Sequence, residues 1–132
     1  MNFQLLDAGG AGLAYFILGI FIAFIVFAIL AEAAIMLKMK YNSQFKKTLL
    51  DSFIANVVTL ALGFVLIEYV SDYFNSTDTV ALLILYTITV FVEWGVLCLL
   101  NKTHPVKKGL LVSVVMNLVS YSVLFLIAFS RS

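Results

Sequence analysis

Long apolar stretches separated by short polar connections dominate the sequence. Four of them have about the 20 residues that a helix needs to cross a ~30 Å hydrocarbon layer, and they run over residues 13–37, 49–70, 79–100 and 110–129. Apolar and polar residues do not alternate with a period of two, as barrel strands require, and in lipid a helix satisfies its own backbone hydrogen bonds. The pattern therefore predicts the all-α fold class, with four transmembrane helices in a single domain over residues 1–132.

Composition points to the same class of protein. Hydrophobic residues make up 64% of the chain and charged residues 11%, and the mean hydropathy is +1.13, values that a soluble domain of this size does not reach. The formal net charge is only +1, and no basic stretch is interleaved with aromatic residues. Nucleic acid is therefore excluded as a partner, and the lipid bilayer is the partner that we expect.

The polar connections differ in their charge. Seven of the eight basic residues fall in the segments 38–47 and 102–108, which follow the first and third apolar stretches. The positive-inside rule places both lysine-rich loops in the cytoplasm and both chain termini outside. Tyr41 lies in the first of these loops, where it suits an interfacial aromatic belt. We expect an integral protein of the bacterial inner membrane.

The second half of the chain repeats polar residues of the first half at a constant offset of 61 residues. In this register the matched polar pairs are Glu32 with Glu93, Ser52 with Ser113, Asn56 with Asn117, the similar Thr59 with Ser120, and Lys46 and Lys47 with Lys107 and Lys108. Composition alone makes apolar residues coincide, but it does not align Glu, Ser and Asn without a gap. The register predicts two tandem helical hairpins, over about residues 11–70 and 72–131. Since each hairpin contains two spans, the repeats are parallel, with a pseudo-twofold axis along the membrane normal.

The matching polar residues share faces and depths in the predicted helices. Ser52, Asn56 and Thr59 are spaced by four and three residues, which places them on one stripe of a helix. Glu32 and Asn56 both lie roughly 9 to 14 Å inside the nearest lysines at ~1.5 Å per residue. We therefore predict a polar seam between the helices, formed by Glu32, Ser52, Asn56, Thr59, Glu93, Ser113, Asn117 and Ser120.

Two interpretations of the polar seam remain open. Asn and Ser side chains often join membrane helices, contributing about 0.6 to 2 kcal/mol each, and a protonated Glu can donate to a neighbouring oxygen. The seam would then only brace the bundle of a non-catalytic accessory subunit in a larger membrane complex. Alternatively, a charged side chain in the membrane costs about 2.5 to 3.5 kcal/mol, and burial disfavours its ionised form, which suits a carrier of protons or cations. The seam would then line a polar cavity open to the cytoplasm.

Catalytic chemistry has no support in the sequence. The sole histidine, His104, lies in a lysine-rich loop, and the sole cysteine, Cys98, lies within an apolar stretch. There is no metal-ligand spacing, nucleophile elbow, phosphate-binding loop or dinucleotide fingerprint, so we expect neither an enzyme nor a cofactor or metal site. The favoured function is transport or conduction of a proton, a cation or a small polar solute. Because four helices leave much of their surface uncovered, we also expect a homo-oligomer or a partner membrane protein.

Overall fold

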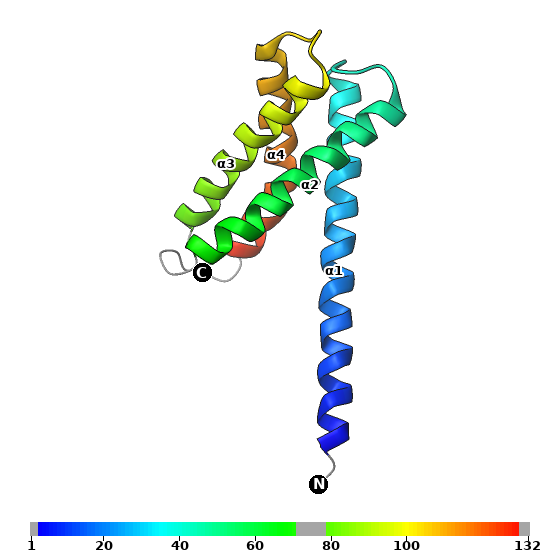
Figure 1. Cartoon of the computed structure of the whole chain (residues 1–132), viewed down its shortest axis with the longest axis vertical. Helices are drawn as coiled ribbons and strands as arrows, with labels where there is room; N and C mark the ends of the chain where they lie inside the picture. Colours follow the sequence, from blue (N-terminus) through cyan, green and yellow to red (C-terminus); the bar gives the residue numbers. More distant parts are fainter. Residues whose placement is uncertain (1–2, 71–78, 130–132) are drawn as a thin grey trace.

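The structure, a computed structural model, describes residues 3–70 and 79–129 and is built from α-helices (Figure 1). The four helices are α1 (Phe3–Lys38), α2 (Phe45–Val70), α3 (Thr79–Leu100) and α4 (Val106–Phe129). Each contains a stretch that is long and apolar enough to span a membrane. The all-helical fold class and the four predicted spans are thus confirmed, and they indicate an integral membrane protein.

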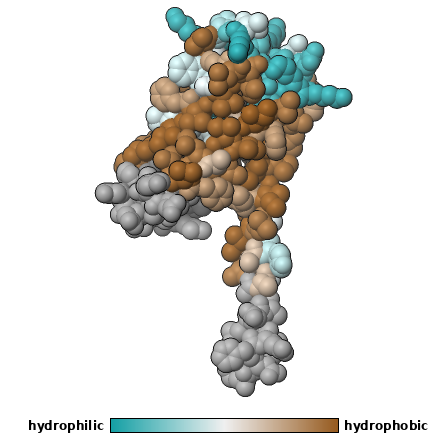
Figure 2. All heavy atoms as spheres, in the orientation of Figure 1, coloured by the Kyte–Doolittle hydropathy of each residue, from teal (hydrophilic) through white to brown (hydrophobic). Residues whose placement is uncertain are grey.

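The helices pack as a ring. Each helix packs against the next one along the chain, and α4 also packs against α1; between the described residues, the backbones of the diagonal pairs α1 with α3 and α2 with α4 do not approach closely. The loop between α1 and α2 and the loop between α3 and α4 lie at the same end of the bundle, which we call the lysine end (Figure 1). Hydrophilic residues gather at this end, above a broad hydrophobic surface (Figure 2).

A helix-ending turn shapes the lysine end of α1. The Tyr41 amide donates to the Met36 carbonyl at 2.8 Å, and the Lys40 amide donates to the Leu37 carbonyl at 3.0 Å. This is the Schellman arrangement, and it requires a left-handed residue, which here is Lys40 with φ of 50°. The reversal brings Tyr41 into the bundle, where it is 1% exposed.

A small apolar core fills the lysine end of the bundle. Tyr41 packs there with residues from α1, α3 and α4, and each is at most 1% exposed: Met36, Leu97, Val112 and Met116. The expectation that Tyr41 belongs to an interfacial aromatic belt is therefore wrong, because the turn after α1 points the ring inward. Gly109 of α4 lies against α3, where a Cβ would make ordinary van der Waals contact with Trp94 and Cys98 at 3.4 Å.

The first half of α1 extends away from the other helices (Figure 1). Every residue from 11 to 23 is exposed on all sides of the helix, including the large apolar side chains of Leu13, Phe16 and Ile20. In a membrane protein such a surface contacts lipid or another protein. The bundle proper is therefore built from the second half of α1 and the other three helices.

Candidate functional site

Glu32 occupies the interface between α1 and α2. Its side chain is 1% exposed and is held by donors from two other helices. From α2, the Ser52 hydroxyl donates to Glu32 Oε2 at 2.8 Å, and the Asn56 amide nitrogen donates to the same oxygen over a very short distance. From α4, the Ser120 hydroxyl donates to Glu32 Oε1 at 3.0 Å. Both carboxyl oxygens of Glu32 are thus engaged by the protein.

Glu93 occupies the corresponding interface between α3 and α4. It is also 1% exposed, and the Asn117 amide nitrogen donates to its Oε2. The Ser113 hydroxyl donates to the Val90 carbonyl at 2.8 Å, and the Ser52 hydroxyl similarly reaches the Ile29 carbonyl at 3.2 Å. Ile29 and Val90 are themselves 61 residues apart, so these two hydrogen bonds join residues that share one offset along the chain.

The two carboxyl groups are linked but are not equivalent. They lie close enough to interact electrostatically. Ser120 bridges from α4 to Glu32, whereas its sequence counterpart Thr59 donates to the Ala55 and Asn56 carbonyls of its own helix. Among the described residues, Asn117 is the single hydrogen-bond donor to Glu93, and it leaves Oε1 without a donor. The structure therefore brings seven of the eight predicted seam residues into two interhelical clusters and places Thr59 beside them.

A cavity of about 440 Å³ opens where the four helices meet around the two glutamates. Glu32, Asn56, Thr59, Glu93, Asn117 and Ser120 line it, whereas Ser52 and Ser113 do not. The lining also includes Thr89, which the helical spacing places on the face of Glu93, and Tyr121, which sequence reasoning missed; their hydroxyls lie 2.8 Å apart. Tyr121 lies four residues after Asn117 and therefore on the same face of α4. Helical spacing is the sequence signal that would have identified it.

The cavity extends away from the lysine end. Along α1 its lining runs from Glu32 back to Phe21, and along α2 it runs from Phe53 on to Leu66. On the other side of the glutamates, the apolar core around Met36 and Met116 fills the space toward the lysines. The sequence led us to expect a cavity that opens toward the lysine loops, but among the described residues the cavity extends the other way.

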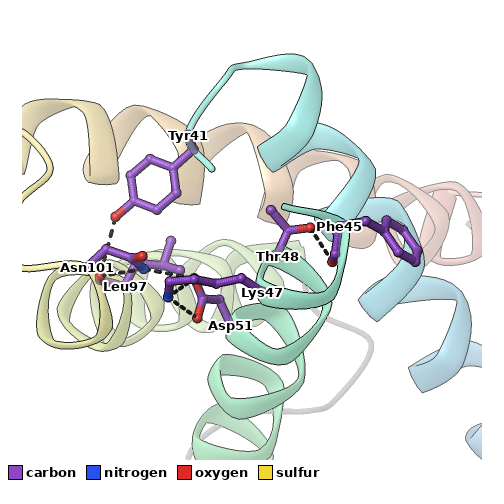
Figure 3. Close-up of polar contacts among 7 residues, drawn as sticks. All are labelled: Tyr41, Phe45, Lys47, Thr48, Asp51, Leu97 and Asn101. Atoms are coloured by element: carbon purple, nitrogen blue, oxygen red, sulfur yellow. Dashed lines mark hydrogen bonds and ion pairs between the residues drawn. The ribbon is translucent and has the colours of Figure 1, made fainter. Parts of the chain in front are cut away.

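A second polar cluster closes the lysine end (Figure 3). Asp51 of α2 is 2% exposed; it accepts from Lys47 Nζ at 3.1 Å and from the Asn101 amide at 2.9 Å. Tyr41 donates its hydroxyl proton to the Leu97 carbonyl at 3.3 Å, and Lys108 Nζ donates to the Lys40 carbonyl at 2.7 Å. The bonds of Asn101, Tyr41 and Lys108 connect the two hairpins, whereas the bond of Lys47 lies within α2. No sequence pattern indicated the pair Asp51 and Asn101, which are 50 residues apart and do not match at the 61-residue offset.

Tyr41 gives the lysine end a measurable pH dependence. Burial, with smaller contributions from Cys98 and Asp51, raises the pKa of Tyr41 from 10.0 to about 12. Between pH 10 and 12 the unfolded chain loses this proton while the folded chain keeps it, so folding stability falls as the pH rises. We expect Tyr41→Phe to remove a slope of at most about 1.4 kcal/mol per pH unit in that window. Unfolding of both proteins in mixed micelles measures this, and parallel pH profiles would contradict it.

Among the residues that the structure describes, no three His, Cys, Asp or Glu side chains are grouped so as to hold a metal ion. Comparison with protein-family models, with characterised proteins and with solved structures finds no match to this chain. The feature that bears on function is therefore the site itself, in which two buried, hydrogen-bonded carboxyl groups line one cavity between four membrane helices.

Proposed function

We propose that the protein is a small membrane transporter or channel that handles a proton, a cation or a small polar solute through Glu32 and Glu93. The observation that carries the proposal is that both carboxyl groups line one cavity of about 440 Å³ between the helices. Side chains that only hold helices together do not need a cavity beside them. Burying an ionisable group in a membrane also costs free energy, and such groups usually mark functional sites.

The pairing of the carboxyl groups supplies a mechanism. Two carboxylates in one apolar site repel each other, and either a proton or a cation relieves this repulsion. The pair therefore exchanges one for the other as a unit rather than as two independent groups. Asn56 and Asn117 hold the two carboxyl groups in place from within their own hairpins, and Ser120 couples the hairpins.

We also propose that the chain arose by duplication of one helical hairpin and that it has a fixed orientation in the membrane. The equivalent hydrogen bonds of Ser52 and Ser113, and of Asn56 and Asn117, support two parallel hairpin repeats. We place the lysine-rich loops in the cytoplasm of a bacterial cell and both termini outside the inner membrane, following the positive-inside rule. The cavity then extends from the glutamates toward the outer side.

Flux through reconstituted protein tests the proposal. Liposomes loaded with a pH-sensitive dye are given a membrane potential or an inward Na⁺ or K⁺ gradient, and the internal pH is followed. We expect the wild type to move protons at least about tenfold faster than Glu32→Gln/Glu93→Gln, because an amide cannot carry the proton. Thr87→Ala is the matched control, since Thr87 is exposed and bonds only within its own helix. Equal rates in a folded double variant would contradict transport.

A second function, that of an accessory subunit, is favoured by one specific observation. Residues 11–20 of α1 are largely apolar and exposed on every side in the single chain, and they line no part of the cavity, so this segment is the surface that a partner in the membrane would cover. Extraction in mild detergent followed by native mass measurement distinguishes the two functions. A stoichiometric foreign partner supports the subunit, whereas a homo-oligomer supports a transporter that acts as an assembly of its own copies.

A further inference from the structure

The walls of the cavity are mostly aromatic and aliphatic. Phe21 and Phe24 of α1, Phe53 and Phe64 of α2, and Leu85 of α3 lie around it, and because Phe53 and Phe64 are more than half exposed, the cavity opens at the surface of the bundle. Its volume of about 440 Å³ lies within the range of sites that bind small organic molecules, and an apolar lining with a few convergent polar groups is typical of such sites. A single dehydrated metal ion or a few waters would leave most of this space and its apolar walls unused.

The polar end of the cavity carries only negative ionisable groups. Glu32 and Glu93 lie there with the neutral polar side chains of both hairpins, and no Lys, Arg or His is among the described lining residues. An anion would therefore be repelled at this end, and a neutral molecule would leave the carboxylate charge uncompensated. A cation is the ligand that this end favours.

The two glutamates differ in what they can offer to a cation. Three side chains donate to Glu32 and engage both of its oxygens. Glu93 receives a donor at Oε2 alone, and in the described part of the chain its Oε1 accepts no hydrogen bond. Because Glu93 also lines the cavity, Oε1 is the carboxyl oxygen that a ligand can contact without displacing a protein donor.

We propose that the cavity binds a hydrophobic monovalent cation, with its charge at Glu93 Oε1 and its apolar body among the phenylalanines. The aromatic faces add cation–π attraction to apolar contact, and a hydrated inorganic cation would obtain neither. This inference rests on the proposed function and specifies its cation. Glu32 shares the exchange of proton for cation, and its hydrogen bonds to both hairpins also hold the site in which Glu93 contacts the ligand.

Binding of three matched ions to the full-length protein in nanodiscs tests the inference. Tetraphenylphosphonium has the charge and the apolar body, tetraphenylborate has nearly the same shape with the opposite charge, and tetramethylammonium has the charge with little apolar surface. With empty nanodiscs as the blank, we expect saturable binding of the first ion only. Binding should weaken by about tenfold or more in Glu93→Gln, because a charged partner is lost, and should be unchanged in Thr87→Ala.

A proton measurement keeps the test independent of any folding defect in the variant. In weakly buffered solution near the pH at which half of the sites are protonated, tetraphenylphosphonium should release protons from the wild type and not from folded Glu93→Gln. Equal binding of tetraphenylborate, or undiminished binding to Glu93→Gln, would overturn the inference. Proton flux without binding of the organic cation would also overturn it while leaving the proposed function in place, whereas binding without any flux would contradict transport alone.

Discussion

Replacing Met116 with alanine is expected to lower the free energy of unfolding by about 2 to 5 kcal/mol. Met116 is fully buried in the apolar core at the lysine end, where α4 meets the end of α1 and the turn carrying Tyr41. In lipid the hydrophobic effect contributes little between helices, so the loss comes from van der Waals contacts around the new cavity. Graded addition of SDS to protein in mixed micelles, followed by circular dichroism, measures the change.

The same helix supplies a control for this substitution. Leu118 lies two residues farther along α4 and is 57% exposed, so Leu118→Ala removes atoms that contact lipid rather than the core. It should change the stability by less than about 0.5 kcal/mol, as substitutions away from packed sites usually do. If both alanine variants were equally destabilised, the packing described at the lysine end would be incorrect.

Replacing Asn117 with alanine is expected to cost about 1 to 3 kcal/mol and to weaken cation binding. Asn117 is 1% exposed and is the single described donor to Glu93, so its removal leaves a buried carboxyl group without a hydrogen bond and free to turn. The same SDS titration measures the stability, and tetraphenylphosphonium binding measures the site.

Asn56 is the matched control, because it donates the corresponding hydrogen bond to Glu32 in the other hairpin. After Asn56→Ala, Glu32 still accepts from Ser52 and Ser120, so we expect a loss of only about 0.5 to 1.5 kcal/mol. The order of the two variants follows from the number of donors that remain. Identical losses would show that the two carboxyl groups are held alike, and a larger loss for Asn56→Ala would reverse their proposed roles.

The fold and part of the site could be predicted because the signals are local. Each apolar stretch is long enough to span the bilayer, and these stretches coincide with the four helices. Glu32 and Asn56, and likewise Glu93 and Asn117, occur at similar depths from the lysines of neighbouring helices. Antiparallel packing of a hairpin then suffices to bring each pair together, and both pairs do form hydrogen bonds.

Other features depend on contacts between distant segments. Asp51 and Asn101 belong to different hairpins, and nothing in the residues near either one shows that the helices bring them within 2.9 Å. Tyrosine is a residue type typical of the membrane interface, but the left-handed turn at Lys40 buries Tyr41. The direction of the cavity depends on side-chain packing at the lysine end. The spacing of residues along one helix does not show how side chains of different helices pack there.

The sequence by itself determined that this is a membrane protein of four helices with costly polar residues at matching depths, because hydropathy and helical spacing are properties of single segments. Only the tertiary structure decided how these residues differ. Serine at position 120 reaches across to Glu32, whereas threonine at position 59 bonds within its own helix, since the positions face different neighbours in the ring of helices. That difference leaves Oε1 of Glu93 available in the cavity, and it distinguishes two glutamates that the sequence presents as equivalent.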